Sequence, residues 1–205
     1  MRFALFLSTI VIVLSGCQLF GPREFEPKGT AFHLNPAISV TKVDAYTPYV
    51  NPRGLFQLGL YCRATGDTVC DTLVAGLFFV PKSKGVQAII ILKPHIIRVG
   101  ATDTIVPIGG FCCHSGRSAP DSGDLFEIGP VTNNSKFEQL IGLVRDKDIT
   151  YDLSLVQMAV WDITDNNRLS QTYIDQINAL PPDTSEHPLS FQPESGRMLK
   201  SKLGR

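Results

Sequence analysis

The stretch "GGFCCHSGRSAPDSGD", residues 109–124, contains two adjacent cysteines followed directly by a histidine. Thiol and imidazole groups can form disulfides, bind metal ions, or act as nucleophile and base in catalysis. Three kinds of site are therefore candidates at Cys112, Cys113 and His114: a disulfide site, a metal centre and a reactive thiol.

A metal centre would need Cys112 or Cys113, His114 and a distant ligand such as His95. Structural zinc takes four ligands, usually in spaced pairs, and adjacent residues rarely converge on one ion. We therefore expect no metal site.

A catalytic thiol needs a base beside it. The histidines are scattered along the chain and none stands in a local protease signature: they are His33, His95, His114 and His187. We therefore expect no enzymatic activity, and no residue pattern implies a cofactor. An envelope enzyme that uses the Cys112 or Cys113 thiol is the weakest of the functional hypotheses.

The N-terminus carries one basic residue, Arg2, then an apolar run over residues 3–14, and then Ser15 and Gly16 before Cys17. This order is typical of a cleaved export signal. The apolar run has about a dozen residues, whereas a membrane-spanning helix needs about 20. We therefore expect residues 1–16 to be removed.

The segment Leu14-Ser15-Gly16-Cys17 resembles the lipobox of bacterial lipoproteins. The resemblance implies that Cys17 becomes the first residue of the mature chain and carries lipid, so that the membrane is a partner. Gln18, rather than aspartate, after the lipidated cysteine implies the outer membrane. An ordinary secretory signal that happens to end in a cysteine is the alternative.

Export would place the four other cysteines in an oxidising compartment, where thiols tend to pair: Cys62, Cys70, Cys112 and Cys113. Four cysteines allow three pairings. Cys62 and Cys70 flank a turn and could bridge two strands. The vicinal pairing is strained, because adjacent α-carbons lie about 3.8 Å apart, below the usual disulfide range. The crossed pairings remain open.

Charge excludes one class of partner. The chain has 19 basic and 19 acidic residues, and removal of Arg2 with the leader leaves 18 and 19, a net charge of −1. No basic run is dense enough to follow a phosphate backbone, so we expect no nucleic-acid partner. An envelope component or a host surface is a candidate partner.

Composition also predicts the domain organisation. With 205 residues, 43% of them apolar, the chain can form one sizeable core, and we place a single globular domain at residues 31–180. Residues 17–30, rich in proline, glycine and charge, are expected to be a membrane-proximal tether. Residues 181–205 contain four prolines and are expected to be an extended or disordered tail.

The elements expected in the domain are strands first and helices second. Short runs rich in β-branched and aromatic residues, separated by glycine or proline, fill residues 31–131, and they favour a sandwich or small barrel. Helical periodicity follows in residues 133–148, 152–165 and 170–180, with a capping-box spacing at Ser135 and Glu138 and a cap at Asp152 or Ser154. The fold class predicted is α+β, with a β core followed by two or three short helices.

The loop "FCCHSGRSAP" and the later segment "LVQMAVWDITDN" together are similar to a pattern in exported bacterial proteins of unknown function. The second segment, Gln157-Met158-Ala159-Val160-Trp161, also resembles the helix of thioester adhesion domains. That resemblance implies a bond between the Gln157 side chain and a cysteine sulfur, from Cys112 or less readily from Cys62. Core packing of the tryptophan helix is the alternative.

Taken together, the sequence predicts a lipid-anchored envelope protein that acts as a structural or binding module. The alternative function is a surface adhesin with an internal thioester between Cys112 and Gln157.

Overall fold

The structure, a computed structural model, describes residues 24–45 and 53–184. The expected signal peptide, Cys17, residues 17–23 of the expected tether and residues 185–205 of the expected tail lie outside the described residues. The described elements follow one another as β1 Gly29–Thr30, β2 Ile38–Ala45, β3 Phe56–Ala64, β4 Val69–Leu73, β5 Leu77–Pro81, β6 Ala88–Ile90, β7 His95–Val99, β8 Thr104–Cys113, β9 Phe126–Thr132, α2 Ser135–Val144, the 3-10 helix η2 Ile149–Tyr151, α3 Leu153–Asn166 and α4 Gln171–Asn178.

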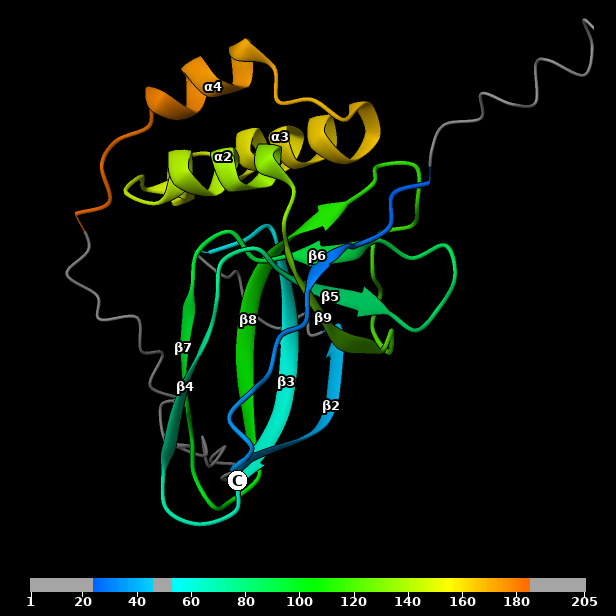
Figure 1. The fold of residues 1–205 in the computed structure, drawn as a ribbon, viewed down its shortest axis with the longest axis vertical. Helices are drawn as coiled ribbons and strands as arrows, with labels where there is room; N and C mark the ends of the chain where they lie inside the picture. Colours follow the sequence, from blue (N-terminus) through cyan, green and yellow to red (C-terminus); the bar gives the residue numbers. More distant parts are fainter. Residues whose placement is uncertain (1–23, 46–52, 185–205) are drawn as a thin grey trace, which may run out of the picture.

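Among the described strands, seven form one curled sheet in the order β1-β9-β5-β6-β8-β3-β2, and β4 and β7 form a second sheet of two strands. Both edges of the curled sheet approach each other, because Asp44 of β2 bridges to Leu125, just before β9. The amide of Ala45 also donates to the carbonyl oxygen of Asp124, at 3.0 Å. The β core followed by three short helices confirms the α+β prediction with a barrel-like core (Figure 1).

One long bent hairpin connects the two sheets. Leu73 lies opposite His95 in the β4-β7 pair, and Phe78 lies opposite Ile90 in the β5-β6 pair, so the same register continues through both. The interruption falls at Gly76, whose φ of +87° is a left-handed conformation that glycine adopts without steric cost. The continuous apolar run at residues 72–80 is therefore divided between two sheets.

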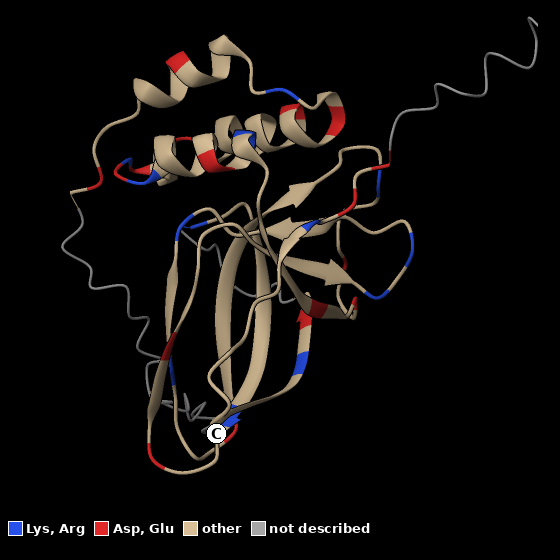
Figure 2. Ribbon diagram, viewed as in Figure 1, with Lys and Arg blue, Asp and Glu red and all other residues tan. Residues whose placement is uncertain are grey.

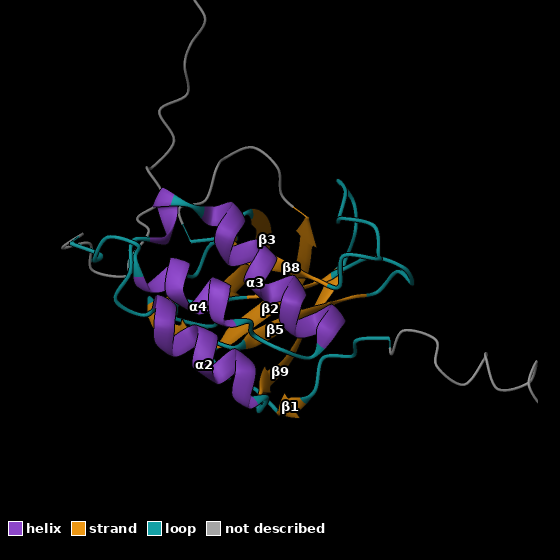
Figure 3. Ribbon diagram, turned by 90° about the horizontal axis from the view of Figure 1, so that it is seen from above, coloured by secondary structure: helices purple, strands orange, loops and turns teal. Residues whose placement is uncertain are grey.

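Two apolar clusters lie on opposite faces of the curled sheet. The inner cluster fills the space between the curled sheet and β4-β7, with Leu58, Leu60 and Ile97 among its members. The outer cluster lies between the sheet and the helices, with Phe78, Phe111 and Val160 among its members. Helices α2 and α3 lie against the strands, and α4 lies above both (Figures 1 and 3).

Local sequence explains where the helices begin. Asn134, not Ser135, caps α2, because its side chain accepts from the amide of Lys136. Of the two predicted caps for α3, Asp152 rather than Ser154 fills the position, and its side chain accepts from the amide of Leu155. None of the helices in residues 24–45 and 53–184 is both long and apolar enough to cross a membrane.

Both ends of the described chain are attached to the domain, which differs from the expected boundaries. Residues 24–30, predicted to belong to the tether, include β1, which pairs with β9. At the other end, the buried ammonium of Lys93 donates to the carbonyl oxygen of Lys147 at 2.6 Å and to Asp183 Oδ2 at 2.7 Å. The expected tail therefore begins with residues that the core holds in place.

Candidate functional site

The two adjacent cysteines are the last residues of strand β8, not part of a loop. Side chains alternate between the faces of a strand, so the two thiols point in opposite directions. Cys112 belongs to the inner cluster and Cys113 to the outer cluster, under the helices. The loop expected at residues 111–120 therefore starts only at His114.

The four described cysteines are free thiols, so the expected disulfides are not formed. Cys62 lies opposite Val40 and Thr104, whereas Cys70 lies opposite Arg98 in the other sheet, so the expected bridge across a β3-β4 hairpin is wrong. A crossed bridge between Cys62 and Cys112 is excluded by distance. Thr104 and Cys112 are eight residues apart on β8, which corresponds to about 26 Å.

Burial also makes three of these thiols poor nucleophiles. Burial raises the pKa of Cys62 to about 11 and that of Cys112 to about 12. The pKa of Cys113 is also raised well above its ordinary value, mainly by burial and in addition by its neighbours Cys112 and Asp165. Because the thiolate is the reactive form, these cysteines are chemically quiet at neutral pH unless a neighbour activates them.

Gln157 on α3 contacts Cys112, 45 residues earlier in the chain. Its Oε1 accepts a hydrogen bond from the Cys112 amide at 2.9 Å, and its Nε2 donates to the Cys112 carbonyl oxygen at 2.7 Å. Strand β3 pairs with β8 only as far as Gly110, so the carboxamide takes the place of a strand neighbour beyond that point. The two residues that the thioester resemblance singled out therefore lie together, joined through the Cys112 main chain.

After β8 the chain turns sharply at His114, whose φ of +71° is unusual for a residue other than glycine. Its amide donates to Thr164 Oγ1 at 2.9 Å, and its Nδ1 lies 3.0 Å from Asp165 Oδ1. Both partners come from the C-terminal turns of α3. The helix thus stabilises a conformation that costs about 1 to 2 kcal/mol in a non-glycine residue.

Asp165 is shared by two residues of the loop. Besides His114, the Ser115 hydroxyl donates to Asp165 Oδ2 at 2.6 Å. Burial alone would raise the pKa of Asp165, but the hydrogen bonds from Ser115, His114 and Thr164 outweigh it and hold the pKa below its ordinary value. The carboxylate lies between the hydroxyl and the imidazole, whereas a serine-hydrolase relay needs the imidazole in the middle.

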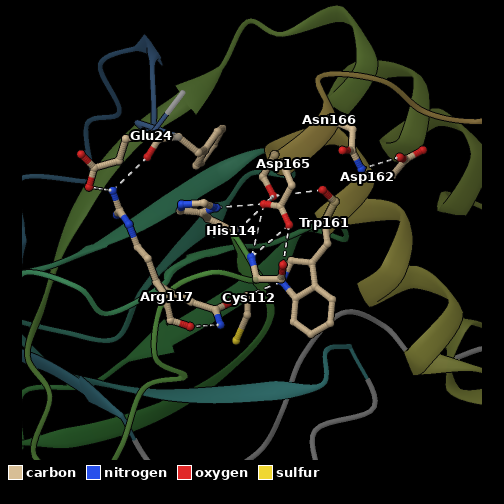
Figure 4. A network of polar contacts seen from close by, with 12 residues as sticks. Glu24, Cys112, His114, Arg117, Trp161, Asp162, Asp165 and Asn166 are labelled. Atoms are coloured by element: carbon tan, nitrogen blue, oxygen red, sulfur yellow. Dashed lines mark hydrogen bonds and ion pairs between the residues drawn. The ribbon is translucent and has the colours of Figure 1, made fainter. Parts of the chain in front are cut away.

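A chain of hydrogen bonds then leads from α3 to the N-terminal segment. Trp161 Nε1 donates to Gln87 Oε1 at 3.3 Å, and Gln87 Nε2 donates to the Arg117 carbonyl oxygen at 2.8 Å. The Arg117 guanidinium in turn donates to Glu24 Oε1 at 2.5 Å and to the Phe25 carbonyl oxygen at 3.3 Å (Figure 4).

A groove of about 620 Å³ lies beside this network, between α3, α4 and Ser115. Its lining mixes aromatic, thioether, amide, hydroxyl and charged groups: Ser115, Met158, Trp161, Asp162, Asp165, Asn166, Arg168, Ser170, Thr172, Tyr173 and Gln176. The sequence reasoning singled out only the helix of Gln157 and Trp161. It missed Asp165 and α4, because each becomes part of the site only when α3 and α4 pack together.

The remaining predicted residues lie elsewhere. His95, at the start of β7, is buried, and its Nε2 lies 3.1 Å from the Gly109 carbonyl oxygen. His33 is exposed, and His187 lies outside the described residues. In the part of the chain that the structure describes, no group of three or more His, Cys, Asp or Glu side chains is placed to hold a metal ion.

Comparisons with protein-family models, with curated proteins and with solved structures give no match for this chain. Its function must therefore be argued from the site itself.

Proposed function

We propose that this protein is a lipid-anchored component of the bacterial cell envelope that acts by binding rather than by catalysis, with the α3-α4 groove as its binding site. The anchor rests on the resemblance of Leu14-Ser15-Gly16-Cys17 to a lipobox, and the observation that carries the binding role is the α3-α4 groove, lined by aromatic and polar side chains. The chain is attached to the domain from Glu24 onward, seven residues after Cys17, so a lipid at Cys17 would hold the domain close to the membrane. In the alternative of an ordinary secretory signal, Cys17 would carry no lipid.

The N-terminal segment is attached by three kinds of contact. Glu24 forms an ion pair with Arg117. The Phe25 ring lies 5.8 Å from the Phe78 ring and 6.2 Å from the Phe137 ring, centroid to centroid. Further along, β1 extends the sheet. Aromatic contacts of this kind stabilise a fold beyond the area that they bury.

A short connection favours a defined orientation. Seven residues span at most about 25 Å when fully extended. The end of the domain that carries Arg117, the groove and the α3 C-terminus would therefore lie near the bilayer, and the turn between β3 and β4, at the opposite end in Figure 1, would project away from it.

The anchor is tested by the substitution Cys17→Ala in the full chain. We expect the wild-type mature chain to begin at a lipidated Cys17 and to sediment with the outer membrane in a density gradient. The Cys17→Ala variant should lose the lipid and leave the membrane fraction, while Cys70→Ala, which removes an exposed thiol, should behave as wild type. A Cys17→Ala chain that still carries lipid would refute the anchor.

The second candidate is a covalent adhesin, and the observation behind it is the contact between Gln157 and the Cys112 main chain. The Cys112 thiol belongs to the inner cluster, so the reaction would require its side chain to turn toward Gln157. In such a protein the Cys112 sulfur attacks the Gln157 carboxamide carbon, a carbon-sulfur bond forms, and the carbon-nitrogen bond breaks. The thiol proton leaves with the amide nitrogen as ammonia. An amine on another surface could later displace the sulfur. The reaction would remove the bond from Gln157 Nε2 to the Cys112 carbonyl oxygen.

Intact mass separates the two candidates. A thioester lowers the mass of the mature chain by about 17 Da through loss of ammonia, and methylamine adds to it. If the thioester forms, Cys112→Ala should abolish both signatures and Cys113→Ala should leave them unchanged. An unreduced wild-type chain of full mass that does not take up methylamine would eliminate the adhesin hypothesis and leave the non-covalent module.

A further inference from the structure

The apolar part of the α3-α4 groove is a strip of three side chains, two of them aromatic rings and one a flexible thioether. Trp161 and Tyr173 are half-buried, and Met158 is 45% exposed. Large apolar groups that remain accessible beside polar ones are typical of ligand sites, and the groove volume lies within the range of about 300–1,000 Å³ that such sites occupy.

The carboxylates of the groove are rigidly held. Asp162 is buried and accepts from Arg168 Nε at 2.9 Å, from Asn166 Nδ2 at 3.1 Å and from the Ser170 amide at 2.9 Å. Burial alone would raise the pKa of Asp162, but these donors outweigh it and keep the pKa below its ordinary value. The turn from α3 into α4 is therefore fixed around one carboxylate, which pre-organises the groove.

Neutral groups of the groove remain available to a ligand. The Thr172 and Gln176 side chains are exposed and form no hydrogen bond to another described residue. Arg168 uses its Nε for Asp162, yet its side chain is 68% exposed, so its terminal nitrogens can still donate. Hydroxyl, amide and guanidinium groups thus stand beside the aromatic strip.

Two carboxylates and one guanidinium among the lining residues give the groove a formal charge of −1. Asp162 is paired with Arg168, and Asp165 accepts hydrogen bonds from three residues, His114, Ser115 and Thr164. In Figure 2 the charged residues of α3 are acidic, and basic charge follows only in the segment between α3 and α4, where Arg168 lies. An anionic ligand would be repelled here, and a cationic ligand would find both carboxylates already hydrogen-bonded.

We propose that the α3-α4 groove binds a neutral oligosaccharide, with sugar rings packed against Trp161 and Tyr173. A pyranose ring has an apolar face of C–H groups, which fits the negative face of an aromatic ring, and a rim of hydroxyls that pair with amide and guanidinium groups. The inference rests on the proposed function, because it names the ligand class of the same binding module.

The experiment is calorimetric titration of the full mature chain, held in a zwitterionic detergent that contains no sugar. The probes are the trimer of β-1,4-linked N-acetylglucosamine, cellotriose, maltotriose and, as a different class, a neutral tetrapeptide. We expect at least one oligosaccharide to bind. Met158→Ala and Gln176→Ala, both exposed and free of contacts that the fold needs, should each weaken binding at least threefold, and Trp161→Phe should weaken it about tenfold.

Tyr151→Ala is the matched control, because Tyr151 is 77% exposed and lies outside the groove. If an oligosaccharide binds all three groove variants as tightly as the wild type, the ligand site lies elsewhere and the proposal is wrong. The proposal is also wrong if only the tetrapeptide binds, or if no probe binds at millimolar concentration. The anchor is judged separately: a chain that binds sugar but carries no lipid would refute the anchor and leave the ligand class intact.

Discussion

Acidification from pH 7 to pH 4 is expected to lower the free energy of unfolding by about 3 kcal/mol through His95 alone. Burial, together with the nearby Arg53 charge, lowers the pKa of His95 to about 4, against an ordinary value of 6.5. The imidazole is therefore neutral in the folded protein and donates from Nε2 to the Gly109 carbonyl oxygen.

The direction of the effect follows from proton binding. Between pH 6.5 and pH 4 the unfolded chain binds a proton at His95 and the folded chain does not, so stability falls as the pH falls through this window. Above pH 6.5 both states are neutral at this site, and below about pH 4 both are protonated, so His95 adds no slope there. The lowered pKa of Asp165 acts only at still lower pH, because an ordinary aspartate titrates near 3.8.

Urea unfolding at several pH values measures how the free energy of unfolding changes with pH. His95→Gln keeps a donor for Gly109 but cannot be protonated, so its stability should change far less between pH 6.5 and pH 4. His33→Gln, which removes an exposed histidine, should keep the wild-type slope. Equal slopes for wild type and His95→Gln would show that His95 is not the group responsible.

Replacement of Gln157 by leucine is expected to lower the free energy of unfolding by about 2 to 4 kcal/mol. Gln157 is 2% exposed, and its carboxamide satisfies both the amide and the carbonyl oxygen of Cys112. Leucine preserves most of the volume but leaves two main-chain groups without partners away from water, and each costs about 1 to 3 kcal/mol. Most of the loss in stability should therefore come from the two lost hydrogen bonds and not from a cavity.

The comparison with Gln139→Leu isolates this effect, since Gln139 is exposed on α2 and its replacement should change stability by no more than about 0.5 kcal/mol. Gln157→Glu gives an independent check. It retains an acceptor for the Cys112 amide but, when ionised, cannot donate to the Cys112 carbonyl oxygen. The free energies of unfolding are measured by chemical denaturation. If Gln157→Leu lowers this free energy no more than Gln139→Leu does, the main chain of Cys112 finds other hydrogen-bond partners.

The helical part of the chain was predictable because its signals are local. In α2 the apolar residues Phe137, Leu140 and Val144 repeat at the period of a helix, and the structure buries all three. Asp152 was identified as a cap for α3 because a side-chain oxygen at that position satisfies a free amide of the first turn. Such contacts join residues within one or two turns, so they can be found in a single sequence.

The predictions that were wrong concern contacts between distant segments. Glycine, proline and charge in residues 24–30 are typical of a tether, but Phe25 fills a space between Phe78 and Phe137 that exists only after β5 and α2 have packed together. The disulfide predictions assumed that β3 and β4, neighbours in sequence, are also neighbours in a sheet. Strand order depends on long-range pairing, which a turn motif does not specify.

By itself, the sequence determined the α+β class, the order of strands before helices and the start of α3 to within the two candidates Asp152 and Ser154, because propensity, periodicity and capping act over a few residues. Only the tertiary structure decided on which face of the sheet each thiol lies. Residues 112 and 113 belong to a strand because β8 pairs with β3 and β6, and neighbouring side chains of a strand point to opposite faces. The same holds for the contact between Gln157 and the Cys112 main chain. The groove, too, exists only because Asp162 holds the start of α4 against α3, through bonds to atoms up to eight residues away.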